Sequence, residues 1–251
     1  MMEFESDEAL AERLAAAAGQ ILIDLRATSG LEGKELGQQG DAQANELLMR
    51  ELRAARPDDA ILSEEEKDSI TRCSFARCWV VDPLDGTREY GEGRTDWAVH
   101  VALAVEGVPT VGAVALPGLG ITLSSANPWP LGAANVPPRM LVSRTRPAAE
   151  PMARSSAPSR SATKTASAAG AKAMAVVRGE ADIYLHTGGQ YEWDNCAPAA
   201  VAAAAGLHVS RADGSPLVYN CENPYLPDLL ICRAEFADEV LRLAGEFAAA
   251  E

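Results

Sequence analysis

Apolar residues return every three or four positions along residues 7–26. This spacing is typical of an amphipathic helix and predicts one at the start of the chain. A second helix is predicted over residues 41–55. The intervening residues 28–40 are polar and rich in glycine, so we expect a loop or a loose hairpin between the two helices.

Short apolar runs of strand length follow the two helices. Residues 60–63 and 78–82 each end at acidic residues, an arrangement that places carboxylates at strand ends. Further strand-like runs are separated by glycine and proline, as in an antiparallel meander. These runs are residues 97–105, 111–116 and 121–125. Residues 144–161, rich in Pro, Ser, Ala and Arg, are predicted to form a long surface connection.

Helices and strands alternate again in the rest of the chain. The pattern predicts strands over residues 139–143, 182–186 and 229–232 and helices over residues 169–177, 195–205 and 234–249. Mixed elements of this kind predict an α/β (α+β) protein in which helices cover layered sheets. We expect two halves, an N-terminal α+β half over residues 1–138 and a C-terminal α/β half over residues 139–251.

The charge of the chain limits its partners. The 251 residues carry a formal net charge of −14, so we expect neither nucleic acid nor anionic membrane as a partner. A phosphate site needs a local source of positive charge, most simply metal ions. The acidic N-terminus does not resemble a signal peptide, and no apolar run approaches the roughly 20 residues that cross a bilayer. The five scattered cysteines form no C-x-x-C pair, which favours reduced thiols and a cytoplasmic protein.

The segment W-V-V-D-P-L-D-G-T, residues 79–87, carries the strongest chemical signal. Pro83 favours an extended backbone at Asp82, so the strand is predicted to end there with its carboxylate beyond the sheet. Asp85 follows in a turn, which brings two carboxylates and the Leu84 carbonyl close together. Hard divalent cations such as Mg²⁺ prefer these oxygen ligands and would relieve the repulsion. The alternative is that both aspartates only cap a turn.

Two further acidic clusters lie at the ends of predicted elements. Glu64 and Glu65 follow the first predicted strand. Asp194 opens a late helix, where it could serve as an ordinary N-cap. Each cluster alone has a structural explanation, whereas the clusters together favour a metal site. His100 lies on an alternating strand and is interpreted as a hydrogen-bonded structural residue.

The order of these clusters resembles that of a known enzyme family. L-S-E-E (residues 62–65), D-P-L-D-G-T (residues 82–87) and E-W-D (residues 192–194) resemble signatures of the lithium-sensitive phosphatases that include inositol monophosphatase. The resemblance implies a layered αβαβα sandwich and a magnesium-dependent phosphatase with about two or three Mg²⁺ ions per site. The implied metal ligands are Glu65, Asp82, Asp85, Asp194 and the carbonyl of Leu84.

The same resemblance assigns the groups that activate water and bind phosphate. A phosphate ester would contact the metals and the backbone amides of Gly86 and Thr87. In the family, a threonine and an upstream acidic residue orient the attacking water, and Thr87 matches the threonine. Glu35 falls on the upstream position when Asp41 is aligned with the family's helix-starting aspartate, although the family usually carries aspartate at that upstream position. The alternative is that Glu35 is merely exposed.

The residues after D-G-T differ among branches of the superfamily. Here they are Arg88, Glu89 and Tyr90, which resemble those of the CysQ-type bisphosphate nucleotidases. This resemblance implies removal of the 3'-phosphate of 3'-phosphoadenosine 5'-phosphate, which yields AMP and phosphate, in sulfate assimilation. One alternative is a broader phosphatase for inositol 1-phosphate and fructose 1,6-bisphosphate. A less favoured one is a nucleotide-binding regulator without turnover.

A substrate with two phosphates needs basic or hydroxyl groups outside the metal cluster. The candidates for contact with the substrate are Arg88, Ser143, Arg144, Ser167, Lys172 and His186. For Lys172 the alternative is a solvated lysine on a helix. The resemblance further implies a homodimer, a small-molecule phosphate ester as substrate and inhibition by lithium.

Overall fold

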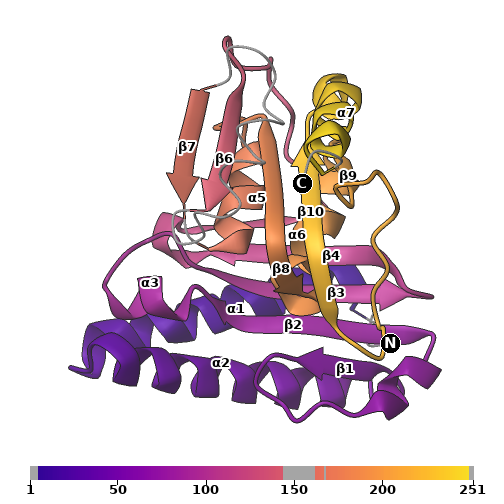
Figure 1. Ribbon diagram of the computed structural model, residues 1–251. Helices are drawn as coiled ribbons and strands as arrows, with labels where there is room; N and C mark the ends of the chain where they lie inside the picture. Colours follow the sequence, from indigo (N-terminus) through magenta and orange to yellow (C-terminus); the bar gives the residue numbers. More distant parts are fainter. Residues whose placement is uncertain (1–4, 144–161, 167, 249–251) are drawn as a thin grey trace.

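Two five-stranded sheets separated by helices form the frame of the protein (Figure 1). The structure is a computed structural model and describes residues 5–143, 162–166 and 168–248. The predicted surface connection over residues 144–161 lies outside these ranges. Within them, no helix is both long enough and apolar enough to cross a membrane.

The first sheet comes from the N-terminal half of the chain and runs in the order β1-β2-β3-β4-β5. β1 pairs with β2 in parallel, and the other neighbours are antiparallel. Its strands are β1 (Ala60–Ser63), β2 (Arg77–Asp85), β3 (Ala98–Val105), β4 (Val108–Leu116) and β5 (Ile121–Ser124). Two long helices, α1 (Asp7–Thr28) and α2 (Gly33–Ala55), cover one face through a core that includes Leu14, Leu48 and Trp79.

The second sheet comes from the C-terminal half and runs in the order β7-β6-β8-β10-β9. β6 is parallel to β7 and β8, whereas β10 is antiparallel to β8 and β9. Its strands are β6 (Arg139–Ser143), β7 (Ala162–Ala166), β8 (Ile183–Tyr191), β9 (His208–Ser210) and β10 (Tyr225–Cys232). One helix, α7 (Ala237–Ala248), packs on the outer face of this sheet through Val240.

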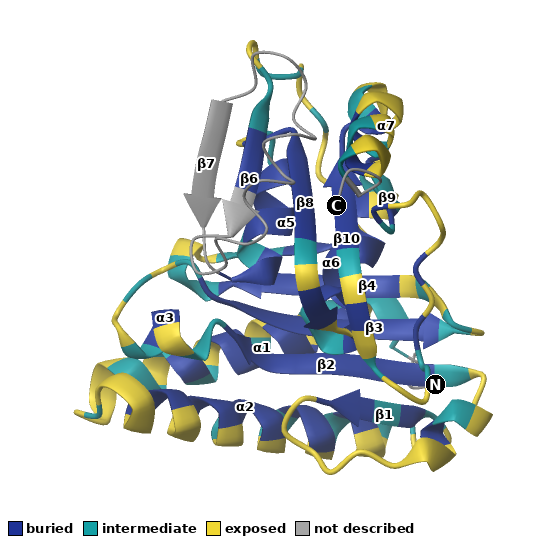
Figure 2. Ribbon diagram, viewed as in Figure 1, coloured by how far each residue is buried: buried dark blue, intermediate teal, exposed yellow. Residues whose placement is uncertain are grey.

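A central helical layer joins the two sheets. The helices α5 (Ala169–Val177) and α6 (Glu192–Ala204) share one core with residues of both sheets, such as Val80, Val114 and Ile231. Figure 2 shows that α6 is largely buried, whereas α2 is exposed on its outer side. The layers therefore follow the order helix, sheet, helix, sheet, helix, which confirms the predicted αβαβα sandwich. The predicted boundary at residue 139 coincides with the start of β6, and the division into domains stays a prediction.

The predicted loop over residues 28–40 is wrong in its second half, because α2 begins at Gly33. The glycines in this stretch are contact positions rather than helix breakers. A Cβ added at Gly37 would lie 2.6 Å from Cγ2 of Thr87, and one at Gly40 would lie 3.0 Å from the Tyr90 ring. The helix carries glycine there because it passes so close to α3 (Thr87–Gly91).

Other boundaries also differ from the predictions. β2 runs through Pro83 to Asp85 instead of ending at Asp82. β8 continues to Tyr191, so that α6 begins at Glu192. β10 begins at Tyr225, several residues before the predicted start, because Tyr225 and Leu226 already pair with β8.

Candidate active site

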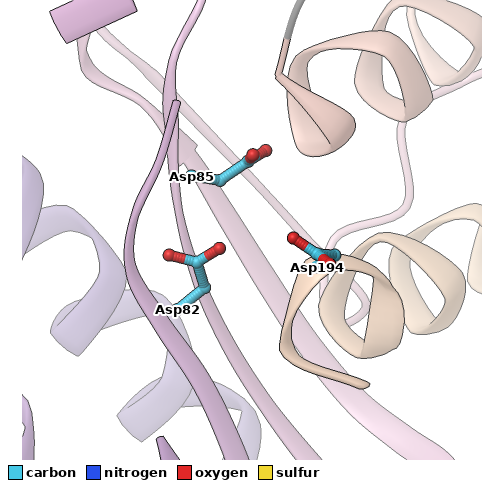
Figure 3. A group of neighbouring side chains, drawn as sticks. All are labelled: Asp82, Asp85 and Asp194. Atoms are coloured by element: carbon cyan, nitrogen blue, oxygen red, sulfur yellow. The ribbon is translucent and has the colours of Figure 1, made fainter. Parts of the chain in front are cut away.

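Three aspartates from separate parts of the chain converge between the first sheet and the helical layer. Each of Asp82, Asp85 and Asp194 offers one carboxylate oxygen, and these oxygens lie within 4.8 Å of one another (Figure 3). Asp82 and Asp85 come from the end of β2, and Asp194 comes from the first turn of α6. The structure thus brings together the three predicted aspartate ligands.

The end of β2 bends so that both of its aspartates face the same space. The pairing with β3 is interrupted between Asp82 and Asp85. Oδ1 of Asp82 accepts a hydrogen bond from the amide of Leu84 at 2.9 Å, which stabilises the bend around Pro83. Gly86 follows with φ of 93°, a left-handed conformation that favours glycine.

Asp85 is held by the beginning of α5. Its carboxylate accepts hydrogen bonds from the amide of Ala169 at 3.2 Å and from the amide of Gly170 at 2.6 Å. Amides at a helix start have no partner within the helix and favour a negative charge. The C-terminal half therefore fixes a carboxylate that the N-terminal half supplies.

Asp194 occupies the third position of α6 and caps that helix from inside. Its Oδ2 accepts a hydrogen bond from the amide of Tyr191 at 2.6 Å, so the residue is not the N-cap itself, a position that Tyr191 holds. The capping role and a metal-binding role do not exclude each other, because a carboxylate has several lone pairs to offer.

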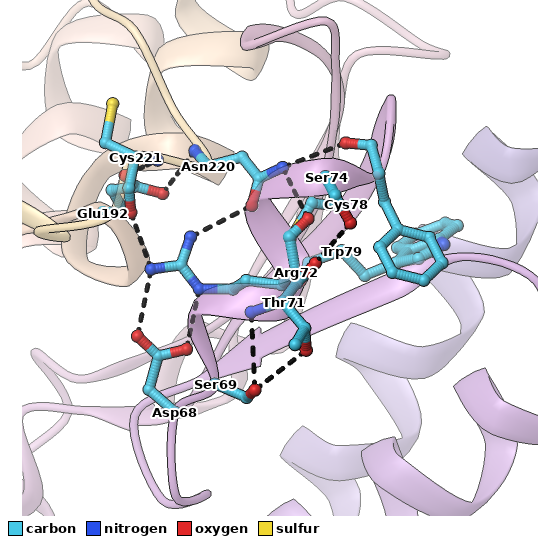
Figure 4. Close-up of polar contacts among 11 residues, drawn as sticks. Asp68, Ser69, Thr71, Arg72, Ser74, Cys78, Trp79, Glu192, Asn220 and Cys221 are labelled. Atoms are coloured by element: carbon cyan, nitrogen blue, oxygen red, sulfur yellow. Dashed lines mark hydrogen bonds and ion pairs between the residues drawn. The ribbon is translucent and has the colours of Figure 1, made fainter.

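A buried arginine, Arg72, holds the segment of chain that anchors the start of α6 (Figure 4). Arg72 donates to both carboxylate oxygens of Asp68 at 2.7 and 3.0 Å, to Oδ1 of Asn220 at 3.0 Å and to the carbonyl of Cys221 at 2.7 Å. The amides of Asn220 and Cys221 in turn donate to the carboxylate of Glu192 at 2.7 and 2.8 Å. This network anchors the first residue of α6 two positions before Asp194.

Of the two glutamates after β1, Glu64 lies in the electrostatic field of the three aspartates, and the metal-binding role of Glu65 stays a prediction. Withdrawal from bulk water and the nearby charges of Asp194 and Asp85 raise the pKa of Glu64 to about 7, against a hydrogen bond with Asp82 that lowers it. Both Glu64 and Glu65 contribute to the negative field at Asp41. A strand this short gives no side-chain alternation that distinguishes the two glutamates, so only the family resemblance favoured Glu65.

The electrostatics of the cluster favour a cation. Asp82 is 1% exposed. Burial, followed by the charges of Glu64, Asp85, Asp194 and Asp41, raises its pKa well above the ordinary range. Close carboxylates in a poorly solvated space cannot all ionise without a counter-charge. Carboxylates together with the Leu84 carbonyl are the hard oxygen donors that Mg²⁺ takes, so the residues present fit such an ion.

Thr87 lies next to Asp41, a residue that the sequence analysis used only to align Glu35. The Thr87 hydroxyl donates to the carbonyl of Leu84 at 3.2 Å. Burial, then Glu65 and Glu64, raise the pKa of Asp41 to about 7, against a hydrogen bond with Thr87 that lowers it. Glu35 is exposed in the first turn of α2. The sequence analysis placed Asp41 at the start of the second helix, but the residue that lies beside it, Thr87, is far away in the sequence, so no local pattern indicated a role with Thr87.

The residues predicted to contact substrate differ in their exposure. Arg88 is exposed and forms an ion pair with Glu92 at 2.8 Å, at the rim of a cavity of about 430 Å³ that Thr87 also lines. Lys172 is 2% exposed, and its Nζ lies 5.1 Å from the centre of the Tyr184 ring. The alternative of a solvated lysine is therefore wrong.

His186 is buried at 4% exposure, and its Nε2 lies 3.0 Å from the carbonyl of Gly189. Arg144 and Ser167 lie outside the described residues, as does the side chain of Ser143. The contacts of these three residues with substrate stay predictions.

The sequence profile of the inositol monophosphatase family matches residues 4–242, nearly the whole chain. The chain belongs to the inositol monophosphatase family. It is a phosphatase of that family, as the signatures in its sequence predicted, and the carboxylate cluster is the candidate metal centre of this metal-dependent family.

Two relatives within the inositol monophosphatase family indicate which branch of the family this chain resembles. A 3'-phosphoadenosine 5'-phosphate phosphatase of Mycobacterium leprae (strain TN) is 47% identical over an alignment of 267 positions, which covers 96% of this chain and 94% of the relative. The 3'(2'),5'-bisphosphate nucleotidase CysQ of Escherichia coli (strain K12) is 32% identical and covers 74% of this chain and 80% of the relative. The resemblance to the CysQ-type branch is confirmed.

Solved structures of the family share the fold. The crystal structure of CysQ from Bacteroides thetaiotaomicron superposes with a TM-score of 0.79 at 22% identity, over 93% of this chain and 99% of that one. Mycobacterium tuberculosis SuhB superposes with a TM-score of 0.74 at 24% identity, over the full length of both chains. At these identities the likeness concerns the fold alone.

Proposed function

We propose that this chain removes the 3'-phosphate of 3'-phosphoadenosine 5'-phosphate in a Mg²⁺-dependent reaction that yields AMP and phosphate. The observation that carries the proposal is the convergence of Asp82, Asp85 and Asp194 within 4.8 Å. The names of the relatives from Mycobacterium leprae and Escherichia coli support the choice of substrate.

The metal ligands in this proposal are Asp82, Asp85, Asp194, Glu64 and the Leu84 carbonyl. About two or three Mg²⁺ ions, when bound, would neutralise the phosphate and lower the pKa of a coordinated water. We include Glu64 because its carboxyl shares a hydrogen bond with that of Asp82. Glu65, the ligand that the family resemblance implied, is the alternative in the same pair.

Thr87 and an acidic partner orient the attacking water in the proposed reaction. The hydroxyl of Thr87 can donate to one oxygen and accept from another, as a residue that positions water must. Asp41 is our preferred partner, because it is buried and lies beside Thr87. Glu35, the partner implied by alignment, is the alternative.

The remote phosphate and the rest of the substrate need groups outside the carboxylate cluster. We propose that the amides of Gly86 and Thr87 bind the scissile phosphate. Lys172 and His186 belong to the C-terminal half and are buried, so their polar atoms offer pre-ordered contacts for a second anionic group. Arg88 lines the cavity that Thr87 also lines.

A single assay tests the proposed function against its alternatives. Phosphate release is measured from 3'-phosphoadenosine 5'-phosphate, inositol 1-phosphate and fructose 1,6-bisphosphate, with Mg²⁺ and with EDTA. We expect Mg²⁺-dependent release with the highest kcat/KM for the nucleotide. A preference for either sugar phosphate supports the broader phosphatase instead, and nucleotide binding without release from any substrate supports the regulator.

The proposal also includes a pathway, a location in the cell and an oligomeric state. A role in sulfate assimilation is implied by the resemblance to the CysQ-type branch. The cytoplasmic location is favoured by scattered, unpaired cysteines. The homodimer is testable by light scattering at micromolar concentration, where a mass near the monomer's 26.4 kDa would contradict it.

A further inference from the structure

His100 lies in the centre of the molecule, next to the carboxylate cluster and fully buried at 0% exposure. It belongs to β3, where it pairs in register with Asp82 of β2. Its ring extends toward the central helices, because α5 and α6 both pack on β3. A histidine at such depth loses its hydration and needs polar partners to compensate.

The two ring nitrogens face two different parts of the site. Nδ1 lies 3.0 Å from the carbonyl oxygen of Trp193. A carbonyl only accepts, so Nδ1 carries the proton and donates. Nε2 lies 3.4 Å from Oδ2 of Asp85 and has no hydrogen-bond partner among the described residues.

The first turn of α5 closes over the same ring. A Cβ added at Gly170 would overlap Nε2 and the neighbouring carbons of His100. The amide of Gly170 is also one of the two that hold Asp85. The imidazole therefore fills the junction of three elements. β2 carries Asp85, α5 carries the amides that hold Asp85, and α6 carries Asp194.

We propose that His100 is a positioning residue of the metal centre. The ring fixes the peptide that precedes Asp194 through the hydrogen bond from Nδ1, and it packs against Gly170, whose amide holds Asp85, so that ligands from the two halves keep their separation before a metal binds. The inference rests on the proposed metal-dependent function. Groups that hold metal ligands in this way typically contribute 10-fold to 100-fold to metal affinity or activity in other proteins.

Three substitutions separate the hydrogen bond from the packing. The amide nitrogen of Asn in His100→Asn can reach the position of Nδ1 and keep the hydrogen bond. The side chain of Gln in His100→Gln reaches the position of Nε2 and fills that space without the hydrogen bond, and His100→Leu has no polar group at all. The matched control is His208→Gln, because Nε2 of His208 lies 2.8 Å from the Ser210 hydroxyl, on β9 in the second sheet. Mn²⁺ serves as the probe, and its binding is measured by electron paramagnetic resonance of the free ion.

We expect His100→Leu to weaken Mn²⁺ binding by about 10-fold or more, while His208→Gln binds like the unaltered protein. His100→Asn should retain more affinity than His100→Gln, because it keeps the hydrogen bond to the Trp193 carbonyl. In the phosphatase assay, the Mg²⁺ concentration for half-maximal rate should rise for His100→Leu, with a smaller change in kcat at saturating Mg²⁺.

The melting temperature in EDTA distinguishes positioning from mere packing. The inference is overturned if His100→Leu is folded in EDTA and binds Mn²⁺ as tightly as the unaltered protein. If His100→Leu does not fold, equal and undiminished affinities of the Gln and Asn variants overturn it. Failure of the unaltered protein to bind Mn²⁺ would refute the metal-dependent function itself, which is a separate outcome.

Discussion

Asp82→Asn should abolish turnover and, at the same time, stabilise the metal-free protein. Asp82 is buried among carboxylates whose nearest oxygens lie within 4.8 Å. Two full charges at that separation repel by about 3.5 kcal/mol at an effective dielectric constant of about 20. The cluster is partly protonated near neutral pH, so we expect only about 1–2 kcal/mol of this to be recovered. Asn keeps the acceptor that binds the amide of Leu84.

For a chain of this size the expected rise in melting temperature is about 2–8 °C. The assay is thermal unfolding in EDTA, followed by circular dichroism, and then in Mg²⁺. Mg²⁺ should raise the melting temperature of the unaltered protein and leave that of Asp82→Asn nearly unchanged. The matched control is Asp58→Asn, an exposed aspartate outside the cluster, which should change neither value.

The pH dependence has a definite sign. The pKa values of Asp41 and Glu64 are raised to about 7 in the folded protein, and that of Asp82 is raised as well. A raised pKa means that the folded state binds more protons than the unfolded state, so the metal-free protein should lose stability as the pH rises from about 4 to above 7. Asp82→Asn should flatten this slope. A metal-free Asp82→Asn protein that melts below the unaltered protein, with an unchanged slope, would refute the electrostatic reasoning.

The other expectations concern the water-orienting pair and two structural contacts. Asp41→Asn should lower kcat by about 100-fold or more and Glu35→Gln by less than about threefold; the reverse order in steady-state kinetics would restore Glu35 as the partner of Thr87. Arg72→Lys loses the fork of hydrogen bonds in Figure 4, so urea unfolding should show a loss of about 2 kcal/mol, and unchanged stability would contradict the anchoring role. Gly37→Ala places a methyl group 2.6 Å from Cγ2 of Thr87, which should cost about 1–3 kcal/mol by the same measurement and lower kcat; an unchanged kcat would show that α2 can move away without consequence.

The fold was predictable from the sequence where one periodicity dominates. The helix over residues 7–26 and the strand over residues 60–63 follow patterns that local burial alone explains. The start of α2 was not predictable, because Gly37 and Gly40 resemble loop residues until α3 is seen to pack against them. Tertiary contact, rather than helix propensity, decides that segment.

The candidate site also has residues that the sequence predicted and residues that it did not. Asp82, Asp85 and Asp194 belong to motifs whose order along the chain resembles the signatures of the family, so their convergence could be predicted. Which of Glu64 and Glu65 binds metal depends on the direction in which the chain leaves β1, which no periodicity records. Asp41 and His100 depend on neighbours far away in the sequence, such as Thr87 in one case and Trp193 in the other, and only the folded arrangement reveals them.

The most direct test of the metal centre is an anomalous-difference map from crystals grown with Mn²⁺. We expect peaks bounded by the carboxylates of Asp82, Asp85 and Asp194, with Glu64 completing the ligand set. Mn²⁺ bound elsewhere, with no peak between these three carboxylates, would contradict the account.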